Sequence, residues 1–267
     1  RKRFMIPKPY IAKWQEHAPW KEFSQIEQDL IISRTLVEIF SDDFLRENLA
    51  FRGGTALYKL YLIPAPRYSE DIDLVQIKEG PIKPIMERLN EVITFFEEER
   101  ATQVRGHGAK ALYRFTSEYE EIRMRLKLEI NCKEHFNVLD WVDFPFTIES
   151  EWFSGKAEIR TYNINELLGT KLRALYQRRK GRDLFDLDYA RQNMDLNYEQ
   201  IITCFKEYTS FATGKRPPSK KEFLLNIEEK EVSAEFTGDM EALLRPEIKY
   251  NQRNAFNWLK TELIEKI

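Results

Sequence analysis

Two aspartates in one short segment have the side chains and the spacing for metal-dependent chemistry. Asp71 and Asp73 lie two positions apart in EDIDLVQI, where polar and apolar residues alternate as they do along a strand. Both carboxylates then project from one face, while Ile72 and Leu74 point to the other. Two neighbouring carboxylates repel each other unless a cation lies between them, and Mg²⁺ or Mn²⁺ prefers such oxygen-rich surroundings. The pattern predicts a divalent-metal site on this strand.

An Asp-x-Asp pattern alone is weak in a chain this rich in acids, and a second copy occurs further along it. The first copy gains weight from Gly53-Gly54, which follows a predicted strand at 49–52 and precedes a predicted helix at 55–62. Such a turn lets the backbone approach a ligand closely, and the free N–H groups at a helix start attract anions. We expect phosphates there; plain turn geometry is the alternative interpretation.

A third carboxylate lies in RMRLKLEINC, where apolar residues alternate with polar ones. Glu129 therefore belongs to the polar face of a strand that could neighbour the Asp71/Asp73 strand. The alternative is that Glu129 pairs with Lys127 or Arg125 at the surface. Two metal ions on three carboxylates would suit in-line phosphoryl or nucleotidyl transfer.

The elements that must position these residues divide the chain into two parts. Mixed elements are predicted first: helices at 25–40, 55–62 and 82–100, and strands at 49–52, 71–77, 110–116, 123–132 and 157–162. Helical periodicity then dominates, with helices predicted at 165–180, 183–191, 197–209, 219–230 and 250–266. The fold class is α+β: a catalytic domain with a mixed sheet over 1–163 and an α-helical domain over 164–267.

Composition restricts the class of protein. The chain has 267 residues, 42% hydrophobic and 32% charged, which is typical of a globular protein. No apolar run approaches the roughly 20 residues of a membrane span, and no signal-peptide pattern opens the sequence. Cys132 and Cys204 form no metal or disulfide pattern, which favours a reducing cytoplasm. His17, His107 and His135 lack zinc-site spacing and are interpreted as surface or core residues.

The net charge of −2 gives no global attraction to nucleic acid. Charge is instead concentrated in KLRALYQRRKGR, residues 171–182, which carries six basic side chains and no acid. A solvated helix face is the ordinary interpretation of such a run. Contact with a phosphodiester backbone or with a triphosphate is the alternative.

The segment GGTALYKLY…RYSEDIDL resembles the signature of the AbiEii/AbiGii-type nucleotidyltransferases, toxins of bacterial toxin–antitoxin systems. This group includes the MenT toxins and lies within the DNA polymerase β-like superfamily, whose pattern is a Gly-Gly/Ser turn followed by Asp-x-Asp. Gly54 and Asp71 are further apart here than in compact superfamily members, and the longer loop with Arg67 and Ser69 matches this family's own motif.

A second block, LLGTKLRALYQRRKGRDLFDL, resembles the family's helical lysine followed by Arg-Asp-x-x-Asp, so that the resemblance covers about residues 20–195. Lys171 falls in an apolar stripe with Ile164, Leu168 and Leu175. A lysine in such a stripe snorkels outward or is held for its charge. The resemblance favours the second, because the family's lysine meets nucleotide phosphates.

The residues after Lys171 also allow a structural interpretation. Gly181 can close the predicted helix, which makes Asp183 the N-cap of the next one and puts Asp186 in its first turn. The family counts acids of this block among its functional residues, and the capping and functional roles are compatible.

The resemblance implies a Mg²⁺-dependent nucleotidyltransferase that moves NMP from an NTP to an acceptor hydroxyl, with the tRNA 3′ end as acceptor and a block of translation as the result. The implied catalytic residues are Asp71, Asp73, Lys171, Asp183 and Asp186. The implied nucleotide-binding residues are Gly53, Gly54, Thr55, Arg67, Ser69, Lys171 and Arg182. The expected metal ligands for Mg²⁺ or Mn²⁺ are Asp71, Asp73 and Glu129.

The expected partners are an NTP, tRNA and a cognate antitoxin, without a membrane. One alternative keeps the chemistry and changes the acceptor to a small molecule or a protein side chain. The other is a nucleotide-binding interaction module without catalysis, because a fold of this kind hosts many activities.

Overall fold

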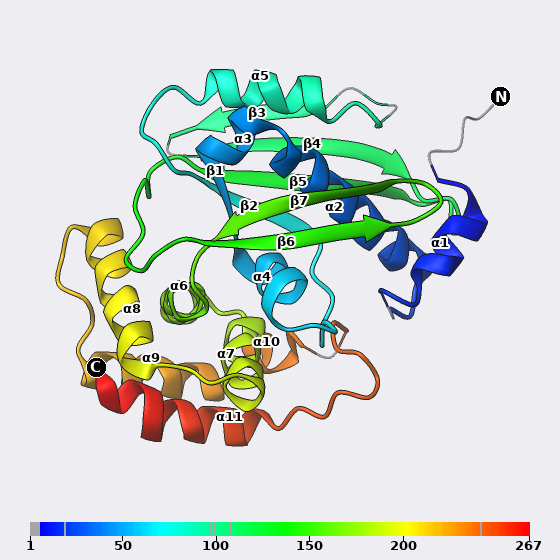
Figure 1. Ribbon diagram of the computed structural model, residues 1–267. Helices are drawn as coiled ribbons and strands as arrows, with labels where there is room; N and C mark the ends of the chain where they lie inside the picture. The colour runs from blue at the N-terminus through cyan, green and yellow to red at the C-terminus, as the bar shows by residue number, and fades with distance from the viewer. Residues whose placement is uncertain (1–5, 19, 97, 99, 107, 241) are drawn as a thin grey trace. The chain divides into compact units, whose positions relative to one another are not determined.

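The computed structural model describes residues 6–267 except 19, 97, 99, 107 and 241. The chain divides into two compact units (Figure 1). The N-terminal unit comprises the described residues up to Phe136 together with Trp141–Tyr162. The C-terminal unit comprises Asn137–Asp140 and Asn163–Ile267.

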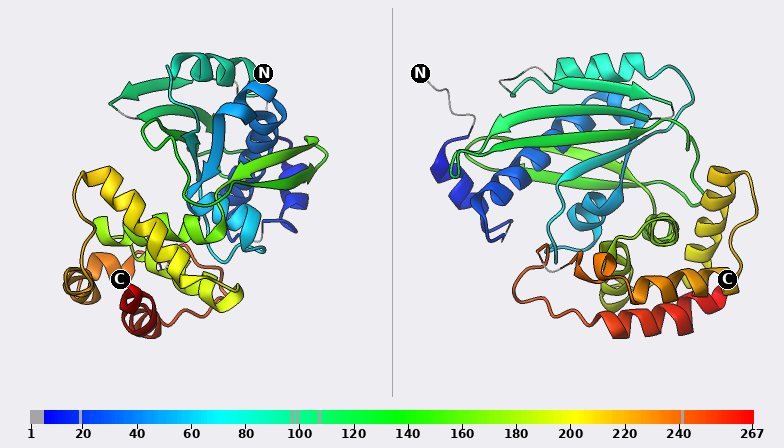
Figure 2. Two further views of the ribbon diagram at one scale, coloured as in Figure 1. Left: turned by 60° about the vertical axis from the view of Figure 1, so that its left-hand side comes forward. Right: turned by 180° about the vertical axis from the view of Figure 1, so that it is seen from behind.

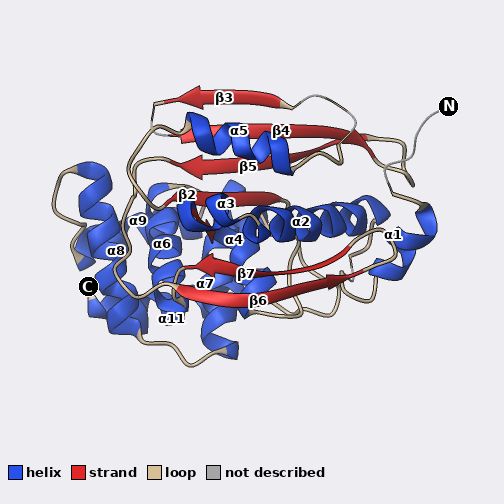
Figure 3. Ribbon diagram, turned by 45° about the horizontal axis from the view of Figure 1, so that its top comes forward, coloured by secondary structure: helices blue, strands red, loops and turns tan. Residues whose placement is uncertain are grey.

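The N-terminal unit is built on one mixed seven-stranded sheet of order β3-β4-β5-β2-β1-β7-β6 (Figures 1 and 3). Its strands are β1 (Leu49–Arg52), β2 (Asp71–Gln76), β3 (Ala101–Arg105), β4 (Gly108–Thr116), β5 (Arg123–Asn131), β6 (Val142–Glu149) and β7 (Ser154–Thr161). β2 pairs antiparallel with β1 and parallel with β5, while β1 also pairs parallel with β7. The strand with the two aspartates is therefore interior to the sheet.

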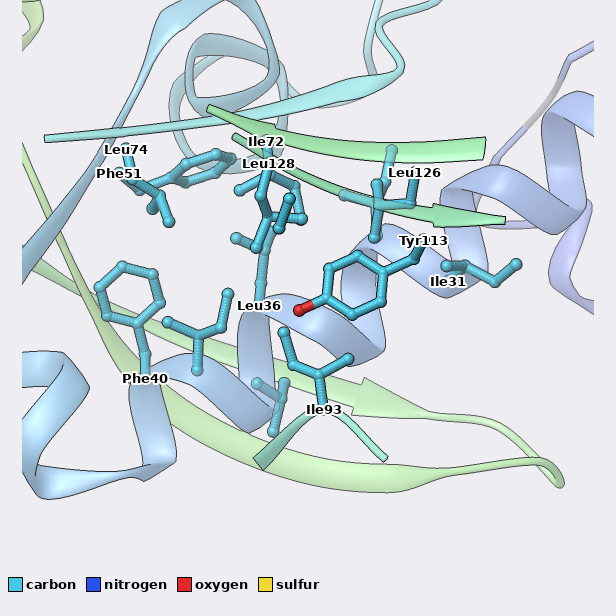
Figure 4. Packing of buried hydrophobic residues seen from close by; sticks show 14 of the residues in the cluster. Ile31, Leu36, Phe40, Phe51, Ile72, Leu74, Ile93, Tyr113, Leu126 and Leu128 are labelled. Atoms are coloured by element: carbon cyan, nitrogen blue, oxygen red, sulfur yellow. The ribbon is translucent and has the colours of Figure 1, made fainter. Parts of the chain in front are cut away.

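Helices cover the sheet and complete its core. They are α1 (Lys8–Trp14), α2 (Phe23–Ser41), α3 (Asp43–Asn48), α4 (Gly53–Ala56), its π-helical continuation η1 (Leu57–Tyr61), and α5 (Lys83–Val92). Helix α2 contacts β5, β6 and β7, and almost all of its apolar side chains are buried. Leu36 and Phe40 of α2 face apolar side chains of the sheet (Figure 4): Phe51, Ile72, Leu74, Leu126 and Leu128. This burial holds Ile72 and Leu74 inward, which leaves the alternate residues of β2 on the other face.

The C-terminal unit is helical, as its colours from yellow-green to red show in Figure 2. Its elements are α6 (Ile164–Gln177), α7 (Gly181–Asn193), α8 (Tyr198–Thr213), α9 (Lys220–Glu231), α10 (Ala234–Gly238), α11 (Gln252–Trp258), η2 (Leu259–Leu263) and η3 (Ile264–Lys266). The buried carboxylate of Glu166 accepts the backbone N–H groups of Val138 and Leu139 at 2.7 and 2.8 Å, which attaches residues 137–140 to this unit. Within the described residues, no helix has both the length and the apolar character needed to cross a membrane.

The α+β class predicted from the sequence is confirmed, and several elements differ from their predicted extents. The helix predicted at 82–100 corresponds to α5, which begins at Lys83 and ends at Val92. Val92 and Ile93 are both β-branched, and Ile93 has a non-helical backbone conformation. Residues 97 and 99 lie outside those described. Strands β3 and β6 were not predicted. Both are edge strands: β3 lacks a clear alternation, whereas β6 alternates regularly but carries Pro145, which an edge tolerates because one side of the strand needs no pairing. Three short helices, α1, α3 and α10, also escaped prediction.

Candidate active site

The Gly-Gly turn lies directly against the second aspartate. Gly53 opens α4 with φ +81°, a backbone conformation that favours glycine. A Cβ added there would lie 2.4 Å from Asp73 Oδ2 and 3.0 Å from Asp73 Cβ, so a larger residue would displace the Asp73 carboxylate. Because Arg52 pairs with Asp73 across β1 and β2, the sheet register creates this close approach. Both the positive φ and the close approach to Asp73 therefore favour glycine at this position. The start of α4 lies next to a carboxylate as a result.

Hydroxyl groups connect this helix start to the first residue of β2. Thr55 Oγ1 donates to the Asp71 carbonyl at 2.5 Å and lies 2.8 Å from Ser69 Oγ. Since the single hydroxyl proton of Thr55 goes to Asp71, Ser69 is the donor to Thr55. The two hydroxyls predicted to bind phosphate therefore bind each other here, and they fix α4 relative to β2.

The strand register gathers three carboxylates on one face of the sheet. Asp71 and Asp73 are half-buried while Ile72 is buried, as the alternation predicts. In the parallel β2–β5 pair, Asp73 stands beside Glu129 and Asp71 beside Lys127. The expectation that the Glu129 strand neighbours the aspartate strand is met.

Two lysines pair with two of these carboxylates, Asp71 and Glu129. Lys127 Nζ lies 2.7 Å from Asp71 Oδ2 and 3.5 Å from Glu129 Oε1, and Lys110 Nζ lies 2.5 Å from Glu129 Oε1. Burial raises the pKa of Glu129, but the hydrogen bond from Lys110 and the charge of Lys127 outweigh it and leave that pKa below its usual value. Burial lowers the pKa of Lys127, but the hydrogen bond to Asp71 and the charge of that carboxylate outweigh it. The pKa of Lys127 is therefore above its usual value. Glu129 and Lys127 are thus both charged near neutral pH.

The donor set on this face fits a hard divalent cation. Asp71 and Asp73 offer carboxylate oxygens from the same side of one strand, which Mg²⁺ and Mn²⁺ prefer. No group of three His, Cys, Asp or Glu side chains among the described residues is already arranged around a metal position. Lys127 supplies positive charge to Asp71, so a metal ion bound by Asp71 would take over the charge balance that this lysine provides. Glu129, held by two lysines, is the least available of the three predicted ligands.

Sequence reasoning missed two basic residues near the aspartates, Arg52 and Lys110, whereas Lys127 was named as a possible partner of Glu129 and lies 3.5 Å from that carboxylate. Arg52 Nη1 lies 2.8 Å from Glu134 Oε2. Burial lowers the pKa of Arg52, but Tyr162, Glu134 and Asp73 together raise it above its ordinary value. The position of Arg52, at the end of a strand and immediately before Gly-Gly, was the one signal that could have identified it.

Arg67, predicted to bind nucleotide, lies in the interior. It is 2% exposed, and its Nη1 donates to the Tyr68 carbonyl at 2.9 Å. Its guanidinium lies over the Tyr58 ring, 4.8 Å from the centroid. These contacts fix the loop before β2. His135, in the same unit, contacts the Gln76 carbonyl at 2.8 Å, and His107 lies outside the described residues.

The second predicted block forms a buried charge cluster inside the C-terminal unit. Lys171 Nζ lies 2.7 Å from Asp186 Oδ2 and 3.2 Å from Asp183 Oδ1. The lysine side chain is 9% exposed and both carboxylates are fully buried. The snorkelling interpretation of Lys171 is therefore wrong: its charge is held inside, against two acids of α7.

Arg178 adds a second cation to Asp183. Its Nε and Nη2 lie 2.7 Å from the two Asp183 oxygens, the paired geometry typical of an arginine–carboxylate bond. Burial raises the pKa of Asp183, but the charge of Lys171 and the hydrogen bond from Arg178 lower it more. Asp183 is thus an anion at neutral pH although no water reaches it.

The capping roles predicted for this block are wrong. Helix α6 ends at Gln177, and Gly181 opens α7 with Lys180 at the N-cap. Asp183 therefore lies in the first turn of α7, and Asp186 one turn further on. Gly181 is needed for a different reason, since a Cβ there would lie 2.4 Å from the Phe236 carbonyl oxygen.

The basic run at 171–182 is partnered within its own unit. Arg182 donates from Nε and Nη2 to both Asp239 oxygens, at 3.1 and 3.3 Å. Arg173 is buried and donates to the Tyr208 carbonyl. Arg179 and Lys180 make longer contacts to the exposed acids Glu229 and Glu235. The simple picture of a solvated helix face does not describe this run.

A mixed sheet with a glycine turn after one strand and Asp-x-Asp opening the next, followed by a helical unit, defines a nucleotidyltransferase-type fold. The family model described as nucleotidyl transferase AbiEii toxin, type IV toxin–antitoxin system, matches residues 34–261. The chain belongs to this family, and the resemblance found from its two motifs is confirmed.

Solved structures share the fold at low sequence identity. The MenT4 nucleotidyltransferase toxin of Mycobacterium tuberculosis is 18% identical with a TM-score of 0.68, over 96% of this chain and 90% of that one. JHP933 from Helicobacter pylori is 18% identical with a TM-score of 0.53, over 91% and 92%. No curated protein sequence matches the chain.

Proposed function

We propose that this toxin-family protein transfers a nucleoside monophosphate from an NTP to an acceptor hydroxyl. The acceptor oxygen attacks the α-phosphorus, the bond from that phosphorus to the β-bridging oxygen breaks, and pyrophosphate leaves. The acceptor proton passes to a carboxylate or to water. The observation that carries the proposal is the close approach of Gly53 to Asp73, which joins an anion-attracting helix start to a carboxylate pair.

In this proposal the N-terminal unit supplies the metal and phosphate ligands. Asp71 and Asp73 would hold Mg²⁺ or Mn²⁺, with Glu129 as a further ligand or base. The ion supplies charge stabilisation at the phosphorus and orients the leaving group when bound. Backbone N–H groups at Gly53, Gly54 and Thr55 would face the phosphates. Ser69 would assist by exchanging its hydrogen bond with Thr55 for one to a phosphate oxygen, and Arg67 would hold the loop that carries it.

The C-terminal unit is proposed to take part through the family's second block. Lys171 and Arg182 would serve phosphate oxygens, each by giving up part of its present carboxylate pairing. Asp183 and Asp186 would then keep Lys171 charged and oriented. The support is the motif itself and the burial of the three charges. Burying charges costs free energy that packing alone would not require, which favours a functional role.

For the acceptor we propose the tRNA 3′ end, with a block of translation as the outcome in the cell. The support is the family membership, which also leads us to expect a cognate antitoxin and action in the cytoplasm. A phosphodiester acceptor requires basic groups, and the exposed Arg179 and Lys180 are held by long contacts, 3.6 Å to Glu229 and Glu235 and 3.9 Å from Lys180 to Asp239.

The test uses each of the four α-³²P-labelled NTPs with Mg²⁺ and total RNA. We expect label in the tRNA band with one preferred NTP, release of pyrophosphate, and loss of both signals with Asp73→Asn. Asp143→Asn is the matched control, because Asp143 is an exposed carboxylate of the same sheet paired with Arg160. Label in protein or in a small molecule would show that the acceptor is that molecule and not tRNA. No label from any NTP would reject the transferase.

Growth tests the toxin assignment separately. Expression of the wild-type chain should slow a bacterial culture, and Asp73→Asn should relieve the effect. Equal inhibition by both proteins at equal abundance would indicate a mechanism of binding without transfer.

A further inference from the structure

Three neighbouring strands of the N-terminal unit carry a concentration of positive charge that extends beyond the candidate active site (Figure 3). The strand register puts these charges on one face of the sheet, because residues directly opposite each other in a pair share a face. We call this surface of β3, β4 and β5 the basic sheet face. It has one acid, Glu129, and six basic side chains: Arg105, Lys110, Arg114, Arg123, Arg125 and Lys127.

The opposite face of these strands belongs to the hydrophobic core, which leaves the basic sheet face open. The residues that alternate with the basic ones along β4 and β5 include Tyr113, Phe115, Leu126 and Leu128, all buried in the core. The basic side chains, apart from the half-buried Lys127, are exposed. A partner can therefore reach their charges from solvent.

Two arginines at the middle of this face lack a counter-ion. Arg114 and Arg125 stand directly opposite each other in the β4–β5 pair, and neither forms an ion pair with an acid among the described residues. Glu98 already binds Arg123, with Arg123 Nη2 2.9 Å from Glu98 Oε2, and its charge reaches Arg114 only from a longer distance. Like charges directly opposite each other on a sheet are destabilising. A bound anion would offset that cost.

The spacing and the composition of the face narrow the class of partner. Arg123, Arg125 and Lys127 recur at every second residue of β5, which separates them by about 6–7 Å. Evenly repeated positive charge suits a partner with evenly repeated negative charge, as a phosphodiester backbone has. The side chains that β3, β4 and β5 direct to this face include no aromatic ring on which a base could stack. The face therefore suits the backbone of a base-paired segment better than unpaired bases.

We propose that the basic sheet face docks the phosphate backbone of a base-paired RNA segment, with Arg114 and Arg125 as its anchors. Arg125 stands two residues before Lys127 on β5, and Lys127 contacts Asp71 of the candidate metal site. A helical segment held on this face thus lies next to the carboxylates at which its own end would react. The inference rests on the proposed function for RNA as the acceptor, and it adds a docking surface outside the reacting groups.

The test measures binding of a short RNA hairpin with an unpaired 3′ end by fluorescence anisotropy, in EDTA and without NTP, over a series of salt concentrations. The test variant is Arg114→Gln/Arg125→Gln. Its control is Arg216→Gln/Arg253→Gln, which removes the same charge from two exposed arginines of the C-terminal unit. We expect the test variant to bind the hairpin about tenfold more weakly at low salt, and the slope of log affinity against log salt to fall by about two. The control should bind as the wild type does.

Thermal melts check that weaker binding is not a loss of structure. The test variant should melt at or above the wild-type temperature, because a like-charge pair is gone. The unpaired strand alone and poly-glutamate are the competitors, and neither should displace the hairpin at an equal concentration of charge. No hairpin binding by the wild type, equal binding by the test and control variants, or displacement by either competitor would overturn the proposal.

Transfer of label measured on the same preparations distinguishes this inference from the proposed function. Transfer to RNA together with hairpin binding that the test variant does not weaken would reject the docking surface alone. Hairpin binding that depends on Arg114 and Arg125, with no transfer from any NTP, would reject the transferase and keep the surface.

Discussion

Each unit of this protein contains a lysine set among carboxylates, and the two clusters differ in their access to water. In the N-terminal unit, Lys127 contacts Asp71 and Glu129, and all three side chains are 27–34% exposed. In the C-terminal unit, Lys171 contacts Asp183 and Asp186, and the two carboxylates have no exposure at all.

The difference in burial determines what each cluster can do. An exposed ion pair contributes about 0–1 kcal/mol, so a metal ion or phosphate can displace Lys127 at little cost. A buried group of charges is costly to break, because removing one partner leaves an uncompensated charge in the interior. We infer that the first cluster exchanges partners readily during function, whereas Lys171 of the second could serve a phosphate only while it keeps one of its two carboxylate partners.

The largest expected effect is on transfer by the exposed cluster. Asp71→Asn and Asp73→Asn keep side-chain shape but lose the charge that would retain a divalent ion, a loss of several kcal/mol or about 10³-fold in rate. Both variants should fold, since neither carboxylate is fully buried. Transfer assays and thermal melts on the same preparations check this. Full activity of either variant at limiting Mg²⁺ would contradict the metal assignment.

The next effect is on stability of the buried cluster. Lys171→Met leaves Asp186 without its cation and should lower the free energy of unfolding by about 3–5 kcal/mol, measured in urea. The double variant Lys171→Met/Asp186→Leu removes the pair as a whole and should recover most of this loss.

Transfer measured on the double variant separates structure from chemistry. If Lys171 also serves phosphate, the recovered fold should stay at least about 10²-fold less active. Wild-type stability of the single variant would mean that Lys171 is not the counter-ion of these acids. Wild-type activity of the double variant would restrict Lys171 to a structural role.

A third prediction compares Asp183, a buried carboxylate with two cations, with Glu27, a buried carboxylate that contacts no cation among the residues that the structure describes. Glu27 is fully buried, and burial raises its pKa from 4.5 to about 7. The hydrogen bond from the Glu118 backbone lowers this pKa, while the charges of Glu118 and Glu120 raise it. Between pH 4.5 and 7 the unfolded chain releases this proton while the folded protein keeps it, so stability falls as pH rises. The loss should reach about 3 kcal/mol.

Urea unfolding of wild type and Glu27→Gln across pH 4.5–8 checks the sign, because the variant should lack this decline. Asp183, with its lowered pKa, should show the opposite behaviour: its contribution persists at neutral pH and is lost as pH falls below the ordinary 3.8. A wild-type curve parallel to that of Glu27→Gln would mean that Glu27 ionises normally.

The smallest expected effect is that of the exposed lysine. Lys127→Met should change the free energy of unfolding by no more than about 1 kcal/mol. Mn²⁺ should bind about five- to tenfold more tightly, as followed by electron paramagnetic resonance, since a competing positive charge is gone. Weaker Mn²⁺ binding would show that Lys127 supports the site and does not compete for it.

Local sequence patterns predicted an element correctly where its structure depends only on its own residues. Strand β1 was predicted at its observed bounds, and the alternation in β2 correctly put Asp71 and Asp73 on one face, because side-chain direction along a strand has a period of two. Two motif blocks in order identified the family. Edge strand β3 was missed because its residues carry almost no hydrophobic pattern, and β6 because Pro145 interrupts an otherwise regular alternation.

Contacts between residues that are distant in the sequence could not be predicted in the same way. That Lys127 stands beside Asp71 depends on a parallel register between strands more than fifty residues apart, and that register depends on how α2 and the sheet bury their apolar faces. Likewise, the first residue of α7, Gly181, lies where a Cβ would come within 2.4 Å of the Phe236 carbonyl oxygen, a contact that local capping rules do not include.

The sequence alone thus determined the residue types, their faces on each element, and the family to which the chain belongs. Only the tertiary structure decided which charges meet: Gly53 against Asp73, Lys127 between two acids, and Lys171 buried on Asp183 and Asp186. The physical reason is the range of the forces involved. Backbone geometry acts over a few neighbouring residues, whereas burial and ion pairing act between segments that only packing brings together.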